Sequence, residues 1–395
     1  MNYKKELHDL CAKMIQTPSV TGTEMNLVQF VRTKMINYGF DEVIIDKVGN
    51  VVGKINKNIE KGKTVLFDGH LDTVAIPNRN SWKKEPFGAE VIDGKIYGRG
   101  SSDMKGALAA MIVAVAKIKE YNTPHGDIYV SGTIFEEIAE GFSLRYVIDV
   151  VKPDYVVIGE ATSLKLNIGQ RGRGEIKVET KGIPSHSANP ERGVNAVTKM
   201  MKLLNEIASI KCPTHPILGK GELVLTDIIS NPFPGASVVP ASCTITFDRR
   251  LLVGETQEVV LLPIQEIIER LSKQDCKFEA TAEIASMNIE TYTGYKTLHE
   301  RFAPGWLMDK NSEIVTKSFE ALKKASDKDP IISCYSFCTN GSCSAGELNI
   351  PTIGFGPSEE YLAHIDDEYI EIETLDKALL GYEQLALSLS LDWRR

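Results

Sequence analysis

The chain has 395 residues, of which 43% are apolar and 25% charged, and its 45 basic and 53 acidic residues leave a net charge of −8. This length exceeds what one hydrophobic core usually organises, so two domains are expected. The acidic balance argues against nucleic acid or an anionic membrane as the main partner, because both favour a basic surface. We see no secretory signal in the polar N-terminus, and no apolar run approaches the roughly 20 residues of a membrane helix.

The first 160 residues alternate between helix and strand patterns. Residues 6–15 carry apolar side chains at helical spacing, and Thr21-Gly22-Thr23-Glu24 predicts a capping box for a second helix that Gly39 ends. The elements that follow are strands at 43–45, 51–52, 64–67, 128–134 and 155–158, and helices at about 106–121 and 144–151. Strands that alternate with helices predict an α/β domain with a mostly parallel sheet covered on both faces.

The pattern changes near residue 172. Residues 175–180 alternate between polar and apolar side chains, as a half-exposed strand does. The elements predicted next are a helix at 193–207, strands at 222–229 and 243–249, a helix at 256–271 and a strand at 277–284. This β-α-β-β-α-β order is typical of a ferredoxin-like α+β unit. We therefore expect an inserted domain at 174–290 between two parts of a main domain, 1–173 and 291–395, which ends in a helix near 374–389.

Seven scattered cysteines form no Cys-x-x-Cys pair. An odd number with this spacing is typical of reduced thiols, so we expect a cytoplasmic protein. Cys334, Cys338 and Cys343 lie close enough in sequence to raise the question of a metal site, but their spacing matches no zinc-ribbon pattern.

Polar residues gather where the predicted strands end. His70 and Asp72 follow the strand at 64–67, where they could be a metal ligand and the carboxylate that orients it. Asp103 lies among glycines at the start of an Ala-rich helix and could equally be an N-cap. Ligands of open parallel sheets bind at the carboxyl ends of the strands, so these residues are candidates for one site.

More acids and a second histidine follow in the same way. Glu136 and Glu137 end a strand, where they are either a solvated pair in a loop or a metal ligand with a general base beside it. Glu160 follows the strand at 155–158, and His364, in a loop, would ordinarily be a surface histidine. Taken together, imidazoles and carboxylates without thiolates suit zinc, cobalt or manganese. Their number fits two ions with one bridging carboxylate.

The sequence resembles the M20 family of metallopeptidases and deacylases, which includes acetylornithine deacetylase, succinyl-diaminopimelate desuccinylase, carboxypeptidases and dipeptidases. The resemblance covers essentially the whole chain. Its motifs are GHLDTV at 69–74, GRGSSDMKG at 98–106, FEE at 135–137, GEAT at 159–162, PSHSANPERGVNA at 184–196, FDRR at 247–250 and GFGPSEEYLAHIDDEYI at 354–370. Among the branches of this family, the residues of these motifs most resemble one that is often described as a selenium-metabolism-linked hydrolase.

The resemblance implies a zinc-exopeptidase-like catalytic domain at 1–173 and 291–395 with two metal ions. The implied ligands are His70 and Glu160 for one ion, Glu137 and His364 for the other, and Asp103 as the bridge. Glu136 would be the general base and Asp72 the partner of His70. The resemblance also implies a cis peptide bond after Asp103.

In the inserted domain, His186 matches a family histidine that reaches across a dimer interface to support the oxyanion in the partner's active site. A histidine hydrogen-bonded within a turn is the alternative. Arg250 matches the family arginine that binds a substrate carboxylate, a task that suits a planar guanidinium. The resemblance therefore implies a homodimer, with the inserted domain as lid and dimerisation surface.

Two departures from the family pattern concern substrate recognition. Ser237 stands where many members carry an asparagine before Val-Val-Pro, and Gly341-Ser342-Cys343 replaces a common Gly-Thr-Asp. We expect a two-metal amidohydrolase that cleaves a peptide or N-acyl amide bond of a small carboxylate-bearing substrate through a metal-bridging hydroxide. Zinc is the first candidate metal, with cobalt and manganese as others. The alternatives are an N-carbamoyl-amino acid hydrolase and a non-catalytic metal-binding protein on the same fold.

Overall fold

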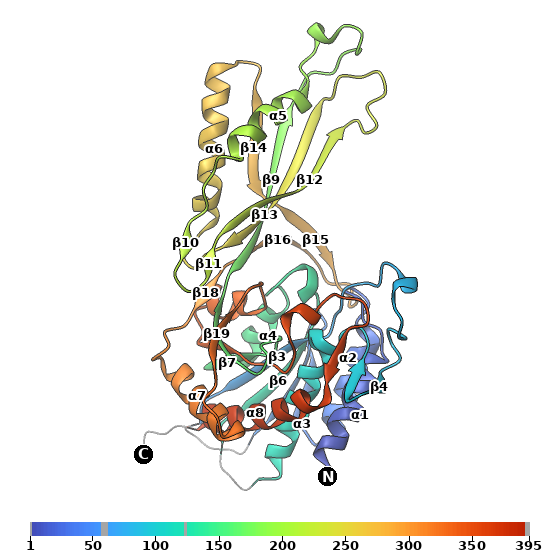
Figure 1. The fold of residues 1–395 in the computed structure, drawn as a ribbon, viewed down its shortest axis with the longest axis vertical. Helices are drawn as coiled ribbons and strands as arrows, with labels where there is room; N and C mark the ends of the chain where they lie inside the picture. The colour runs from blue at the N-terminus through green and yellow to red at the C-terminus, as the bar shows by residue number, and fades with distance from the viewer. Residues whose placement is uncertain (1, 57–61, 122–124, 392–395) are drawn as a thin grey trace. The chain divides into compact units, whose positions relative to one another are not determined.

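The computed structural model describes residues 2–56, 62–121 and 125–391. The chain divides into two compact units (Figure 1). The first unit comprises Met1–Gln170, Asn288–Thr297 and Leu307–Arg395, and the second comprises Arg171–Met287 and Leu298–Trp306.

The first unit is built on a mixed sheet whose central strands are parallel. Its order is β1 (Glu42–Ile45), β2 (Val51–Ile55), β6 (Ile128–Thr133), β3 (Val65–His70), β7 (Tyr155–Ile158), β20 (Thr352–Gly354), β8 (Leu166–Gln170) and β18 (Trp306–Leu307), and β19 (Ile332–Tyr335) also pairs with β8. Strand β3 runs parallel to both β6 and β7, and β20 runs parallel to β7. The antiparallel pairs are β1 with β2, β2 with β6, and β20 with β8. The predicted parallel arrangement is thus confirmed for the centre of the sheet.

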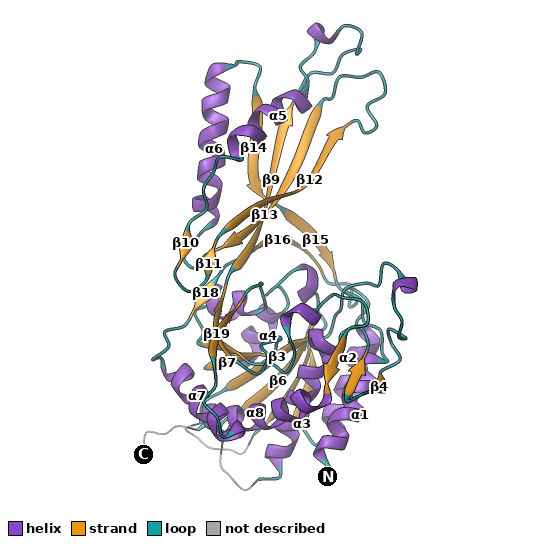
Figure 2. Cartoon of the chain, viewed as in Figure 1, coloured by secondary structure: helices purple, strands orange, loops and turns teal. Residues whose placement is uncertain are grey.

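Helices cover both faces of this sheet, as Figure 2 shows. They are α1 (Tyr3–Ile15), α2 (Met25–Asn37), α3 (Gly106–Lys119), α4 (Leu144–Val151), α7 (Glu313–Ser326) and α8 (Ile372–Ser390). Leu66 of β3 packs with α4, whereas the ring of the adjacent Phe67 meets Tyr382 of α8. Neighbouring strand residues point to opposite faces, so α4 and α8 lie on opposite sides. None of the helices in the described ranges is long and apolar enough to cross a membrane.

The start of α2 corrects the predicted capping box. The helix begins at Met25, and no side chain caps its first turn. Oε1 of Glu24 instead accepts a hydrogen bond from the backbone N–H of Gly22 at 2.8 Å. The Thr21 hydroxyl donates to Oδ2 of Asp72 at 2.8 Å, because that carboxylate lies beside the turn. Gly39, with a φ of 80°, follows the end of the helix as predicted.

The second unit has an antiparallel sheet in the order β12 (Glu222–Asn231), β13 (Ser242–Leu251), β9 (Gly172–Lys181) and β14 (Glu279–Ile284). Helices α5 (Ala196–Ile207) and α6 (Gln257–Gln274) pack against alternate apolar residues of β9 and β13, which form one buried core with them. The order β9-α5-β12-β13-α6-β14 is the predicted ferredoxin-like one.

The boundary of the second unit differs from the expected 174–290. Residues 298–306 also belong to it, because β17 (Phe302–Ala303) pairs with β9. The preceding segment, 288–297, belongs to the first unit. A two-residue strand leaves no periodicity that a sequence could reveal.

Candidate active site and metal centre

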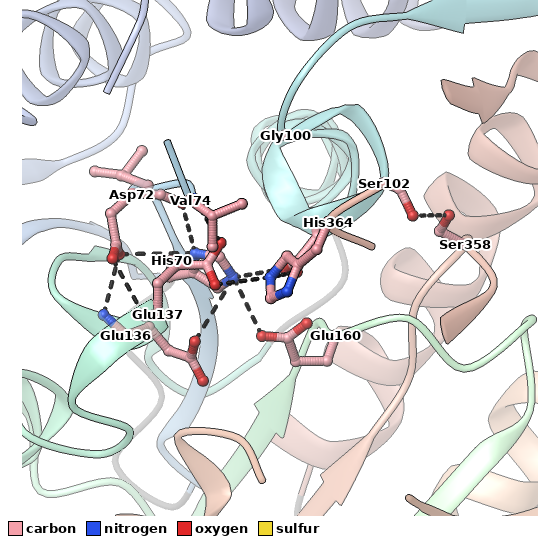
Figure 3. A network of polar contacts seen from close by, with 12 residues as sticks. His70, Asp72, Val74, Gly100, Ser102, Glu136, Glu137, Glu160, Ser358 and His364 are labelled. Atoms are coloured by element: carbon pink, nitrogen blue, oxygen red, sulfur yellow. Dashed lines mark hydrogen bonds and ion pairs between the residues drawn. The ribbon is translucent and has the colours of Figure 1, made fainter. Parts of the chain in front are cut away.

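The parallel strands bring the candidate residues of the first unit to one edge of the sheet. His70 is the last residue of β3, and Glu136 follows β6, with which β3 pairs as far as His70. Glu160 follows β7, the other neighbour of β3. Carboxyl ends of parallel strands meet at the same edge, where ligands bind in open α/β sheets. Figure 3 shows the side chains of His70, Glu137, Glu160 and His364 turned toward one another.

Asp103 lies between the two histidines. Its Oδ1 is 2.8 Å from Nε2 of His70, and its Oδ2 is 3.1 Å from Nε2 of His364. The carboxylate therefore presents a different oxygen to each imidazole. The peptide bond between Asp103 and Met104 is cis, as the resemblance implied.

Each histidine also faces a glutamate. Nε2 of His364 lies 2.9 Å from Oε2 of Glu137, and Nε2 of His70 lies 3.3 Å from Oε1 of Glu160. Oε2 of Glu136 is farther away, at 4.0 Å from Nε2 of His70. All five predicted metal ligands thus lie in one network with the predicted general base.

Two groups of side chains have donor atoms close enough to hold a metal ion. One is His70, Asp103 and Glu137, and the other is His70, Glu136 and Glu160. Imidazole nitrogens and carboxylate oxygens are the donors of catalytic zinc and related ions, so this set fits a divalent metal. Within the described part of the chain, neither group includes a cysteine, which leaves the metal question about Cys334, Cys338 and Cys343 without support.

Unusual backbone conformations direct the ligands into the site. Phe135 has a φ of 62°, a left-handed conformation that breaks the strand before Glu136 and Glu137. Because the chain turns there, adjacent acids need not point to opposite faces. His364 itself has a φ of 64°. Gly100 has a φ of 81°, and a Cβ at this position would lie 2.7 Å from the side chain of Thr73.

Asp72 contacts this network in a way that its sequence position did not reveal. The backbone oxygen of Asp72, at 2.8 Å, is the hydrogen-bond partner of Nδ1 of His70, whereas carboxylate Oδ1 lies 3.7 Å from that nitrogen. The carboxylate instead accepts backbone N–H groups from Glu136 at 3.1 Å and Glu137 at 3.2 Å. Its side chain is fully buried.

Burial and mutual repulsion act on the acidic side chains. Burial is the largest cause that raises the pKa of Glu137 to about 7, and the charge of Asp103 adds to it. Burial likewise raises the pKa of Glu136 well above its ordinary value, and the pKa of Glu160 is raised for the same reason. Ionisation of these glutamates therefore costs free energy in the site, and nearby positive charge would reduce that cost.

The pKa values of the two histidines are also raised, but the cause is their contact with carboxylates. Hydrogen bonds to Asp103 and Glu137 raise the pKa of His364 to about 10. Burial alone would lower the pKa of His70, but the charges of Glu160 and Asp103 raise it well above its ordinary value. Two imidazoles therefore offset only part of the negative charge of four carboxyl groups, a balance that suits divalent cations.

Glu368 is a buried acid of the site to which the sequence assigned no role. Its carboxylate accepts hydrogen bonds from the backbone of Gly100, Ser102 and Asp103, and it pairs with Arg99. The stretch Asp366-Asp367-Glu368 looks like a solvated run of charge. The sequence linked Glu368 to the site only through its position four residues after His364.

His186 and Arg250 belong to the second unit, whereas the network described so far belongs to the first. His186 is exposed, and its Nδ1 accepts the backbone N–H of Ala188 at 3.0 Å. Nε of Arg250 lies 2.9 Å from Oδ1 of Asp248. The roles expected of both residues stay predictions.

Comparison with known proteins gives one consistent family. The sequence model of peptidase family M20/M25/M40 matches residues 66–388. The uncharacterized protein YgeY of Escherichia coli (strain K12) is 31% identical over 399 residues, which cover 99% of this chain and 95% of that protein. A succinyl-diaminopimelate desuccinylase of a Nitratiruptor species is 25% identical over 394 residues, with 97% and 100% covered.

A solved structure has the same fold. The YXEP protein of Bacillus subtilis, described as a dinuclear metal binding peptidase from the M20 family, matches with a TM-score of 0.70 at 12% identity. The match covers 98% of this chain and 99% of that chain. At this identity the likeness shows the fold alone.

Proposed function

We propose, since the chain belongs to peptidase family M20/M25/M40, that it cleaves a peptide or N-acyl amide bond in a small carboxylate-bearing substrate with the help of two metal ions. The family makes the protein a metal-dependent hydrolase. The observation that carries the two-metal proposal is the position of Asp103, whose two oxygens face His70 at 2.8 Å and His364 at 3.1 Å. A carboxylate in this position suits a bridge between two ions.

The remaining ligands divide between the two sides of Asp103. His70 and Glu160 would hold one ion, and His364 and Glu137 the other. These donors suit zinc, and they also accept cobalt or manganese. The description of the YXEP protein as dinuclear metal binding supports the number of ions.

Glu136 is the proposed general base. Bound ions would polarise the amide carbonyl and lower the pKa of a water molecule. Glu136 would accept a proton from the attacking water, whose oxygen joins the carbonyl carbon, and would pass a proton to the nitrogen as the C–N bond breaks. Burial chiefly raises the pKa of Glu136 above its ordinary value, which makes the carboxylate a better proton acceptor than an exposed one.

Two residues of the second unit would act on the substrate. His186 of a partner subunit would donate to the developing oxyanion, a contribution that can reach about 3 kcal/mol for one donor. The guanidinium of Arg250 would bind the substrate carboxylate, for which it would have to share or release Asp248.

The edge of the second unit supports a homodimer. Strand β12 ends the sheet, and it exposes four large apolar side chains, Val224, Leu225, Ile228 and Ile229. A long apolar edge strand is a template for pairing with another chain. We include a cytoplasmic location in the proposal because an odd number of scattered cysteines without a Cys-x-x-Cys pair is typical of reduced thiols.

The test is metal-dependent product release from a panel of dipeptides, N-acyl amino acids and N-carbamoyl amino acids, with bound metal quantified in parallel. Activity that disappears on chelation and returns with zinc, cobalt or manganese would support the proposal and name the substrate class. A preference for N-carbamoyl substrates would mean that the protein is an N-carbamoyl-amino acid hydrolase instead. Absence of both bound metal and turnover would contradict the proposal.

A variant pair tests the division of roles. Glu136→Gln should abolish turnover and leave the metal content near normal, whereas Glu137→Gln should lose metal. Because Glu136 also lies in a group that could hold an ion, metal loss in Glu136→Gln would make it a ligand instead of the base.

A further inference from the structure

Glu368 joins the two loops that carry Asp103 and His364. Its Oε1 accepts the backbone N–H of Ser102 at 2.8 Å and of Asp103 at 3.1 Å. Its Oε2 accepts the N–H of Gly100 at 3.0 Å and a guanidinium N–H of Arg99 at 2.7 Å. The side chain is fully buried, so these hydrogen bonds are shielded from bulk solvent.

The same two segments also meet next to this carboxylate. The N–H of Gly98 donates to the backbone oxygen of Glu368 at 2.8 Å. Strand β21 (Tyr369–Glu371), directly after Glu368, pairs with β5 (Lys95–Tyr97), directly before Gly98. The two loops are thus held together by strand pairing at one end and by the Glu368 carboxylate at the other.

The backbone around Asp103 needs such a partner. Gly100 has a φ of 81°, and Asp103 has φ −125° and ψ 93°, so the turn before α3 is not regular helix. Buried backbone N–H groups without a partner are costly, and the Glu368 carboxylate satisfies several of them at once. Charge-assisted hydrogen bonds of this kind are stronger than neutral ones.

We propose that Glu368 is a positioning residue that holds the Asp103 carboxylate between His70 and His364, so that the two metal ions bind as a pair. It touches neither proposed ion and acts through the backbone of Asp103. This inference rests on the proposed function, because it concerns the same metal centre. The competing interpretation is a purely structural ion pair between Glu368 and Arg99.

The test is Glu368→Gln, with Asp366→Asn as the matched control in the same loop. Asp366 is exposed, so its substitution removes a nearby acid without touching the buried carboxylate. Metal affinity is measured on chelator-treated protein by competition with a chromophoric zinc ligand. We expect affinity for at least one ion to fall about 10- to 100-fold in Glu368→Gln, and kcat to fall with little change in KM. Asp366→Asn should behave as wild type.

Glu368→Gln leaves the buried charge of Arg99 without its partner, which can prevent folding. The double variant Arg99→Met with Glu368→Gln removes both charges and should show the same loss of metal affinity. A purely structural role would lower the unfolding temperature of the metal-free variants but leave the metal affinity of the folded fraction unchanged. That result in either variant overturns the inference.

Hydrogen exchange on the wild type gives a measurement that needs no variant. If Glu368 organises the Asp103 turn before metal binds, the amides of Gly100, Ser102 and Asp103 should be protected in metal-free protein. Free exchange of these amides without metal overturns the inference and leaves the proposed function standing. Failure of the wild type to bind any ion contradicts the proposed function itself.

Discussion

The backbone N–H of Glu136 donates a hydrogen bond of 3.1 Å to Oδ1 of Asp72. Oδ2 of the same carboxylate accepts the N–H of Glu137 at 3.2 Å and the hydroxyl of Thr21 at 2.8 Å. The Asp72 side chain therefore fixes the turn that carries the proposed base and a proposed ligand. His70 depends on Asp72 in a different way, through a backbone oxygen.

Substitution of Asp72 should therefore reduce turnover more than metal binding. In Asp72→Asn an NH2 group replaces one carboxylate oxygen and cannot accept the hydrogen bonds that this oxygen accepts, so we expect kcat to fall about 10- to 100-fold. Metal content should stay near wild type, because the backbone contact to His70 survives. The measurement is kcat together with metal stoichiometry, and Thr21→Val, which removes one of the three hydrogen bonds, is the milder control. Loss of metal with unchanged kcat per bound ion would contradict this assignment.

The sequence could identify the side chains of the site because strand ends show in its pattern. His70, Glu136 and Glu160 each follow a β-branched run, and the carboxyl ends of parallel strands converge. The sequence could not show that the backbone oxygen of Asp72 contacts His70 while its carboxylate binds the backbone of Glu136 and Glu137, because a sequence pattern does not separate the atoms of one residue. The left-handed Phe135, an uncommon conformation for a bulky residue, was equally hidden.

The other features that the sequence did not reveal also depend on contacts that exist only in the folded chain. The Thr21–Glu24 capping box was a local prediction, and a long-range hydrogen bond to Asp72 displaced it. Glu368 is an acid in a polar run, and only the folded chain shows that it is buried. Residues 298–306 join the second unit through a strand too short to recognise in the sequence.

Removal of metal should destabilise the first unit. Binding to the folded state alone stabilises a protein by about 2.7 kcal/mol when the free ion is at about 100 times its dissociation constant. Burial, followed by the charge of Asp103, raises the pKa values of Glu137 and Glu160. Bound cations would stabilise the ionised form of both side chains. Calorimetry of chelated and zinc-saturated protein should therefore show a rise in unfolding temperature with metal. His364→Ala should lose part of that rise, and equal unfolding temperatures with and without metal would contradict the prediction.

Glu24 should make stability depend on pH. Its side chain is fully buried, its Oε2 has no hydrogen-bond partner among the described residues, and burial followed by the charge of Asp72 raises its pKa to about 7. Between its ordinary pKa near 4.5 and this value, the folded state holds a proton that the unfolded state has lost. The stability contributed by protonated Glu24 is therefore lost as pH rises through this window, by about 3 kcal/mol at most.

The neutral variant Glu24→Gln should remove this dependence. Relative to wild type, its free energy of unfolding should be larger at about pH 8, where the variant is the more stable of the two, than at about pH 5. Urea unfolding of chelated protein at both values measures the difference, with Glu42→Gln on the exposed face of β1 as the control. A difference between variant and wild type that does not change with pH would contradict the prediction.

Subunit mixing tests whether His186 acts across a homodimer. Glu136→Gln and His186→Ala should each be inactive or nearly so as homodimers, because each lacks one group in every site. A heterodimer of the two variants contains one site with an intact Glu136 and, from the opposite subunit, an intact His186. Co-expression with different tags, followed by purification on both tags, should therefore restore part of the wild-type activity.

The exposed strand β12 supplies the control for that experiment. Ile228→Lys with Ile229→Lys places two charges on the apolar edge, where pairing with a second chain would bury them. Light scattering should then show monomers, and co-expression of the two inactive variants should restore no activity when both carry the lysines. Restored activity in proven heterodimers, lost with the lysines, means that each site needs a residue of its partner. Heterodimers that stay inactive mean that His186 serves its own subunit, or that the alternative of a turn histidine is correct.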